Sequence, residues 1–458
     1  MRLMTTLATA SLLITASATG IQQSPPDRPN VVLIMTDDAG YADTGSYGAR
    51  DIRTPNIDSL ARDGVKLTDF YANAMSCTPT RAGLIAGRYQ QRYGIEFVLA
   101  SPGVPGSDGG LLPLPHSLPL LMKKNGYATA LIGKWHLGYT REYSPRAHGF
   151  DSFFGFKSAA IDYHTHFTVR PSEGAPFVSA QPDLWEDDAL IEQDGYITDL
   201  ITRRSIEFIN ANATRPFFID VAFNAPHSPV QRPDVPAGKP APGGATRADY
   251  AAVMERVDRG VGEILQTLRA RGLERNTIVI FTNDNGGVGL SHSAPLFHRK
   301  FSAWEGGIRV PALLRWPGRI PAGTVSAQVG MTMDLTASIL AATATPVPSD
   351  ARLEGVNLFP ILERKAPQVE RTLFWRTGGP SPVNMNQKAV RSGDWKLMID
   401  GAVTRIFLFN VKADPGERQD LFARRPDIAQ RLQKLLAEWE RDVDAEAKVH
   451  RAARPTPA

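Results

Sequence analysis

The amino-acid sequence predicts an α/β fold: a large mixed, mostly parallel sheet sandwiched by helices, followed by a smaller C-terminal α+β subdomain. Strand-length apolar runs alternate with helical patterns from residue 30 onward, and this alternation is typical of a parallel sheet covered by helices. Beyond about residue 365 the pattern changes to short strands, which favours a separate short antiparallel sheet. A terminal helix with an apolar stripe is expected to pack on that sheet.

The buried strands are expected where the sequence is continuously apolar, as in the run over 30–36. We expect strands at 30–36, 65–71, 128–132, 216–223, 277–282, 389–399 and 405–411, and helices at 54–62, 117–125, 196–210, 246–268 and 426–443. Residues 101–115 are rich in glycine and proline, and residues 155–193 follow no regular pattern, so both are expected to be irregular.

The first twenty residues resemble a secretory signal peptide, because Arg2 precedes an apolar stretch over 7–16 that ends in small residues. We divide the chain into a signal peptide (1–20), a linker (21–29), a main domain (30–365), a C-terminal subdomain (366–448) and a flexible tail (449–458). The apolar stretch is short for a bilayer span. We therefore expect an exported, periplasmic or secreted protein without stable membrane insertion; the alternative is a leader that remains as a membrane tether.

The composition excludes several classes of protein. The formal net charge is only +4 and no dense block of lysine and arginine occurs, so no nucleic-acid partner is expected. The hydrophobic content of 42% and charged content of 21% are ordinary for a soluble globular protein. A single cysteine excludes both a disulfide framework and a cysteine-based metal cage within the chain.

That cysteine, Cys77, lies in an unusual local sequence. Pro79 biases Thr78 toward extended geometry, and Thr80 is typical of a helix opening. We expect Cys77 just ahead of a helix N-terminus with Arg81 in the first turn, a place that favours anions and activated nucleophiles. The alternative is a buried structural thiol.

Polar side chains follow five of the expected strands, and the carboxyl ends of parallel strands share one edge of a sheet. They are Asp37 and Asp38, Cys77 and Arg81, Lys134 and His136, His227, and Asp284 with Asn285 and Lys300. Lys134 and His136 alternate on expected extended backbone, so their side chains should point the same way. Three carboxylates and one amide carbonyl suit a calcium or magnesium ion rather than zinc. The lysines, arginine and histidines add an anion pocket, which indicates transfer of a sulfuryl or phosphoryl group.

Five motifs follow one another along the chain: C-T-P-T-R from Cys77 to Arg81, G-K-W-H-L-G from Gly133 to Gly138, A-P-H at 225–227, D-N-G at 284–286 and W-E-G-G-I-R-V-P from Trp304 to Pro311. Taken together and in this order, they resemble the type I sulfatases of the alkaline phosphatase superfamily. The C-terminal segment from Val411 to Glu417 is similar to the arylsulfatase and N-acetylgalactosamine sulfatase branch. Two positions depart from the common pattern: Thr80 stands where many members have serine, and the approach to Lys300 differs.

The resemblance implies an alkaline phosphatase-like fold and a sulfatase acting on an aryl sulfate or a sulfated carbohydrate. It implies that a formylglycine-generating enzyme oxidises Cys77 to formylglycine during maturation. The implied ligands of Ca²⁺, with Mg²⁺ less favoured, are Asp37, Asp38, Asp284, Asn285 and the modified Cys77. Arg81 and Lys134 would hold the aldehyde hydrate, His136 would act on it as a base, and Lys300 and His227 would grip the sulfate and serve its leaving oxygen.

Two other functions remain open from the sequence. One is a phosphonate monoester or phosphodiester hydrolase of the same superfamily, since some of those carry the same cysteine motif. The other is a non-catalytic binder of sulfated glycans, against which the intact set of charged residues argues. For substrate selectivity, His164, His166 and Arg170 are candidates to contact a sugar or its carboxylate; the alternative is that they are exposed loop residues.

Overall fold

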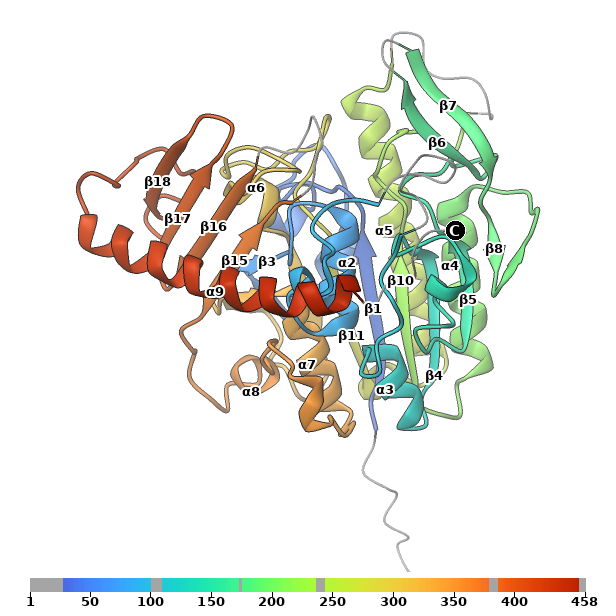
Figure 1. Ribbon diagram of the computed structural model, residues 1–458. Coiled ribbons are helices and arrows are strands. Elements are labelled where there is room, and N and C mark those ends of the chain that lie inside the picture. Colours follow the sequence, from blue (N-terminus) through green and yellow to red (C-terminus); the bar gives the residue numbers. More distant parts are fainter. Residues whose placement is uncertain (1–27, 100–108, 173–174, 236–243, 379–385, 453–458) are drawn as a thin grey trace, which may run out of the picture.

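The computed structural model describes residues 28–99, 109–172, 175–235, 244–378 and 386–452. The predicted signal peptide and most of the predicted linker lie outside these residues, as do parts of the loop expected at 101–115 and of the tail. The chain folds around one large sheet, with a second, smaller sheet beside it (Figure 1).

The large sheet has ten strands. They are β1 (Asn30–Thr36), β2 (Val65–Leu67), β4 (Ala128–Lys134), β5 (Ser152–Phe156), β8 (Trp185–Glu186), β9 (Ala189–Leu190), β10 (Phe217–Ala222), β11 (Thr277–Asn283), β12 (Ala312–Arg315) and β13 (Thr324–Ser326). Their order is β13-β2-β12-β11-β1-β10-β4-β5-β8-β9. The five central strands from β11 to β5 are parallel, whereas β12 and β8 pair antiparallel beside them. The predicted mixed, mostly parallel sheet is therefore confirmed.

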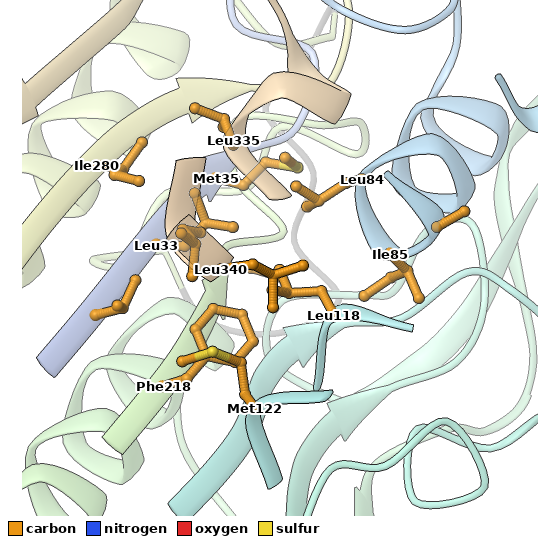
Figure 2. Packing of buried hydrophobic residues seen from close by; sticks show 14 of the residues in the cluster. Leu33, Met35, Leu84, Ile85, Leu118, Met122, Phe218, Ile280, Leu335 and Leu340 are labelled. Atoms are coloured by element: carbon orange, nitrogen blue, oxygen red, sulfur yellow. The ribbon is translucent and has the colours of Figure 1, made fainter. Parts of the chain in front are cut away.

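Helices cover both faces of this sheet, because its central strands are apolar on both sides. The helices are α1 (Pro55–Arg62), α2 (Cys77–Ala86), α3 (Leu118–Lys124), α4 (Ile197–Ala211), α5 (Arg247–Ala270), α6 (Glu305–Ile308), α7 (Thr332–Ala342) and α8 (Phe359–Leu362). One face packs against α2, α3 and α7, and Figure 2 shows Leu84, Leu118 and Leu340 from these helices. The other face packs against α1, α4 and α5.

The C-terminal sheet and the last helix match their prediction in kind, with different bounds. The antiparallel strands are β15 (Thr372–Arg376), β16 (Gln387–Ser392), β17 (Trp395–Asp400) and β18 (Arg405–Asn410), and helix α9 spans Pro426–Ala452. Leu432, Leu436, Trp439 and Val443 of α9 join the same buried cluster as the strands. The single strand expected at 389–399 is a hairpin, since Gly393 adopts a left-handed φ of 58° between β16 and β17.

Two further expectations differ from the structure. The strand expected at 65–71 is split: β2 belongs to the large sheet, whereas β3 (Phe70–Tyr71) pairs with β14 (Gly330–Met331). The region expected to be irregular at 155–193 contains the end of β5, the short strands β8 and β9, and the hairpin of β6 (Phe167–Ser172) and β7 (Ala175–Pro182). In the part of the chain that the structure describes, no helix has both the length and the apolar character of a membrane span.

The sheet leaves almost no space around Gly133, the residue before Lys134. Its φ is 122°, and a Cβ atom there would lie 1.9 Å from the carbonyl oxygen of Ala222 on the neighbouring strand β10. A side chain at this position would push β4 and β10 apart. The close contact therefore fixes how Lys134 is presented at the end of β4.

We predict that Gly133→Ala destabilises the protein more than Gly318→Ala. Gly318 also has positive φ, at 79°, but a Cβ atom there meets nothing within 4 Å. Gly318→Ala therefore adds only backbone strain of about 1–2 kcal/mol, whereas Gly133→Ala adds a further cost of about 1–3 kcal/mol for overpacking. Urea unfolding followed by circular dichroism measures both. Equal losses in the two variants would contradict the close packing at Gly133.

Candidate active site

The carboxyl ends of four adjacent parallel strands bring the predicted polar residues together. Asp37 and Asp38 follow β1, Lys134 ends β4, His227 follows β10, and Asp284 and Asn285 follow β11. Because these strands lie in the order β11-β1-β10-β4, their ends form one continuous edge. This part of the expected arrangement is what the structure shows.

Cys77 and Arg81, the remaining predicted set, do not come from this sheet. Cys77 is the first residue of α2, which follows β3 of the two-stranded sheet, so the expectation that all five sets share one sheet edge is wrong for Cys77 and Arg81. The helix begins at Cys77 itself rather than after it, because Ser76 is extended and adopts the N-cap position. Lys300 also lies in a loop, with its backbone N–H donating to the carbonyl of Gly287 at 3.0 Å.

The Cys77 thiol is buried within the acidic part of this cluster. Its Sγ and one carboxylate oxygen each of Asp37 and Asp284 lie within 4.8 Å of one another. Burial raises the pKa of the thiol, although Lys134 and Lys300 oppose that effect. An unmodified Cys77 is thus a protonated thiol and not an activated nucleophile.

Three buried ion pairs join the acidic and basic side chains. Lys134 Nζ lies 2.5 Å from Asp37 Oδ2, Lys300 Nζ lies 2.6 Å from Asp38 Oδ1, and Arg81 Nη2 lies 2.9 Å from Asp284 Oδ2. Each of these side chains is at most 6% exposed. Each carboxylate therefore has one cationic partner, and the six charges sum to zero.

The neighbours of the carboxylates set their protonation. Burial raises the pKa of Asp38, but the charges of Lys300 and His227 outweigh it and hold the pKa at about 2. Burial, together with the charge of Asp37, raises the pKa of Asp284 to about 6 despite Arg81. Two carboxylates that face each other without a cation between them repel, and a divalent cation at this point would relieve that repulsion.

The two histidines differ in their contacts. His227 Nδ1 lies 2.7 Å from the carbonyl oxygen of Ser228, and its Nε2 lies 3.5 Å from Asp38 Oδ2. His136 is fully buried, and neither ring nitrogen has a hydrogen-bond partner within the described part of the chain. Its φ of 56° is left-handed, so the extended backbone predicted from Lys134 to His136 ends before the histidine. Burial lowers the pKa of His227 to about 3 and that of His136 well below its ordinary value, with Lys134 adding to the effect at His136.

The buried side-chain oxygens of this cluster that lack a hydrogen-bond partner suit a hard cation. Asp37 Oδ1 and Asn285 Oδ1 are buried and have no hydrogen-bond partner among the described residues. Asn285 Nδ2 donates to Asp38 Oδ1 at 2.7 Å, so the amide is oriented with its nitrogen on that carboxylate. Ligand atoms of Asp37, Asp38 and His227 also lie within 4.8 Å of one another. Carboxylate and amide oxygens at this spacing are suited to Ca²⁺ or Mg²⁺.

Comparison with known proteins assigns the family. The sulfatase family model matches residues 29–345, and a model of the C-terminal region of N-sulphoglucosamine sulphohydrolase matches residues 294–442. The chain belongs to the sulfatase family.

Relatives match over nearly the whole chain and are named sulfatases, that is, sulfuric ester hydrolases. The N-acetylgalactosamine-6-sulfatase of Mus musculus is 30% identical, with 94% of this chain and 91% of that protein covered. Arylsulfatase J of Mus musculus is 30% identical over 90% of this chain and 76% of its own length. The crystal structure of Ps i-CgsB in complex with k-i-k-neocarrahexaose has a TM-score of 0.80 and 30% identity, covering 90% of this chain and 92% of that one.

The three loop residues predicted to contact substrate lie in different settings. His164 is half-buried, with Nε2 at 3.1 Å from the carbonyl oxygen of Arg232. His166 is buried, its Nε2 lies 2.9 Å from the carbonyl oxygen of Gly195, and burial lowers its pKa. Arg170 lies in β6, and its side chain is outside the described part. The role of all three in binding stays a prediction.

Two residues that hold parts of this candidate site were not predicted from the sequence. The Tyr163 hydroxyl donates to the carbonyl oxygen of His227 at 2.8 Å and so fixes the backbone of that histidine. Asn283, the last residue of β11, holds the loop that follows the neighbouring strand β1, because its Oδ1 accepts from the Ala39 backbone N–H at 3.2 Å. Asn283 could have been identified from the sequence, because it directly precedes Asp284. Tyr163 could not, because its position depends on the fold of a region without a regular sequence pattern.

Thr80 of the C-T-P-T-R motif anchors the loop that leads to Cys77. Its buried Oγ1 accepts from the Ala74 backbone N–H at 3.0 Å and lies 3.3 Å from the Ala74 carbonyl oxygen. A serine has the same hydroxyl, so the departure from the common family pattern keeps these contacts.

We predict that Thr80→Ala lowers the free energy of unfolding by about 1–3 kcal/mol, because it leaves the buried Ala74 backbone groups unpaired. Thr80→Ser is the matched control, and it should cost no more than about 1 kcal/mol for the lost methyl group. Denaturant unfolding of the three proteins provides the comparison. Equal stability of the alanine and serine variants would show that the hydroxyl does not anchor the loop.

Proposed function

We propose that this sulfatase is exported and hydrolyses sulfate esters of carbohydrates, using Ca²⁺ and a formylglycine made from Cys77. The observation that carries the proposal is the neutral cluster of three carboxylates and three cationic side chains, with unpartnered oxygens on Asp37 and Asn285. A divalent cation bound to these oxygens would give the cluster a net charge of +2. A buried site of that charge attracts a compact anion such as a sulfate ester.

The residues that would hold the cation are Asp37, Asp38, Asp284 and Asn285, joined by residue 77. When present, formylglycine supplies a hydroxyl nucleophile, and calcium supplies positive charge next to the sulfuryl oxygens. Arg81 and Lys134 lie beside residue 77 and orient its side chain. These assignments are supported by the contacts that join the strand ends to the start of α2.

His227 is suited to move a proton at the leaving oxygen. A carbonyl oxygen can only accept, so the contact with Ser228 places a proton on Nδ1. His227 would give a proton to the leaving oxygen only as an imidazolium, whose second proton is on Nε2 beside Asp38 Oδ2. Lys300 would pair with a sulfuryl oxygen, since its charge lies at the same edge. His136 is held neutral by burial and by the cations around it, which suits a base that takes a proton from a hydroxyl of residue 77.

Maturation must take place before folding is complete. Cys77 is 1% exposed, and the whole of α2 is buried. A formylglycine-generating enzyme would therefore have to read the C-T-P-T-R motif in the unfolded chain. The proposed partner in maturation thus acts on nascent or exported, unfolded protein.

The carbohydrate assignment is supported by the relatives. The Ps i-CgsB structure contains a neocarrahexaose, and the mouse relative is named for a sulfated amino sugar. A phosphonate or phosphodiester hydrolase is less well supported, because the curated relatives matched at 30% identity are sulfatases. A glycan binder without turnover would not require the histidines and the lone cysteine to converge.

We predict sulfatase activity only in protein whose Cys77 has been converted. Protein co-produced with a formylglycine-generating enzyme should show the modified peptide by mass spectrometry and hydrolyse an aryl sulfate and one or more defined sulfated mono- or disaccharides. Cys77→Ala, produced in the same way, should lose roughly a thousandfold or more in kcat. Protein made without the modifying enzyme is the matched control and should be equally inactive.

Three outcomes would contradict the proposal. Full activity of Cys77→Ala would exclude the cysteine-derived nucleophile. A higher kcat/KM on an aryl phosphonate or phosphodiester than on every sulfate ester tested would favour the other hydrolase. Tight binding of a sulfated saccharide by verified, modified protein without turnover would favour the glycan binder.

A further inference from the structure

A carboxyl group lies within the apolar core beneath the active site. Asp220 is in the middle of the central strand β10, on the same face as Phe218 because side chains alternate along a strand. Figure 2 shows Phe218, Met35 and Leu84, which belong to the buried cluster on that face. Asp220 is 5% exposed, and its Oδ1 has no hydrogen-bond partner in the part of the chain described by the structure. A buried oxygen without a partner is costly and calls for an explanation.

A small cavity adjoins this carboxyl group. Its volume is about 10 Å³, and its polar lining comes from Asp220, Arg81 and Lys134. The remaining lining residues, which include Leu84 and Trp135, are apolar. A cavity of this size has room for about one water molecule, which needs at least two polar partners to be held.

Arg81 can supply the second partner. Its Nε and Nη2 both donate to Asp284 Oδ2, at 3.1 and 2.9 Å, and its Nη1 donates to the Lys134 carbonyl oxygen at 3.0 Å. These bonds use three of the five N–H groups of a guanidinium, so two remain. Burial raises the pKa of Asp220 to about 7, and the charge of Arg81 opposes the rise. Arg81 and Asp220 are thus close enough to interact but are not directly hydrogen-bonded.

We propose that Asp220 is a positioning residue for Arg81, acting through one water molecule in this cavity. The water accepts a hydrogen bond from a free N–H of Arg81 and donates one to Asp220 Oδ1. The guanidinium is then held directly by Asp284 at the active site and indirectly by Asp220 from the core. This arrangement keeps Arg81 oriented toward residue 77 whether or not substrate is bound.

The first test is structural and does not depend on activity. A high-resolution crystal structure of the unaltered protein should show one ordered water within about 3 Å of both Asp220 Oδ1 and a guanidinium nitrogen of Arg81. In Asp220→Leu the water should be absent and the Arg81 side chain less well ordered than its neighbours. A dry cavity in the unaltered protein would overturn the inference, even if the protein proved to be an active sulfatase.

The second test is kinetic, and only this test rests on the proposed function. Asp220→Leu should lower kcat by about tenfold, the effect of losing one hydrogen bond to a charged group, with KM little changed. Asp220→Asn keeps the shape of the side chain and one acceptor oxygen. Its kcat should lie between those of the unaltered protein and Asp220→Leu, at a loss of about threefold. A purely structural role would lower thermal stability and leave kcat as it was.

Asp258→Asn is the matched control. Asp258 is another buried carboxyl group, but it caps α1 through the backbone N–H groups of Asn56 and Ile57, at 3.0 and 2.8 Å. This variant should lose stability and keep the parental kcat. Parental kcat in both Asp220 variants, or an equal loss in Asp258→Asn, would overturn the inference. If Asp220→Leu fails to fold, Asp220→Asn and the water in the unaltered protein decide the question.

Discussion

The mutual compensation of six buried charges is the constraint on which this site depends. Taking a single carboxylate or ammonium group out of water costs several kcal/mol, and the cost is offset only when a partner is close and well placed. Here each carboxylate is paired with one cationic side chain, as in the ion pair of Lys134 with Asp37. Removing one member would leave its partner charged and buried without compensation. The loss of any one of the six side chains would therefore destabilise the whole cluster. Its neutrality also means that an added divalent cation makes the site strongly attractive to anions.

The fold meets this constraint by bringing short, rigid pieces of chain to one place. Parallel strands end at one edge, and their apolar side chains are locked between helices on both faces. The position of α2 above this edge places Cys77 and Arg81 opposite the aspartates. Since the helix is fully buried, the side chains at its start have little freedom to move. The arrangement is therefore preorganised, which is the usual way in which a protein stabilises developing charge.

Much of the large sheet and of the site could be predicted because the signals are local. Continuously apolar runs followed by acids predicted β1 and β11 and the cluster at their ends. The origin of Cys77 could not be predicted in this way, since residues 65–71 look like one strand and only tertiary pairing divides them between two sheets. The left-handed backbone of His136 likewise could not be predicted from the strand pattern that precedes it. Asp220 could be recognised as unusual in an apolar strand, but its relation to Arg81 depends on the cavity between them.

We propose that the oxygens of this cluster take up one divalent cation. Isothermal titration of Ca²⁺ into metal-free protein tests it most directly. One Ca²⁺ should bind per chain, and Asp37→Asn and Asn285→Ala should each weaken binding by about tenfold or more. Asp188→Asn, at an exposed carboxylate away from the cluster, should bind as the unaltered protein does. Absence of a Ca²⁺ site in the unaltered protein, or unchanged affinity in the Asp37 and Asn285 variants, would contradict the claim.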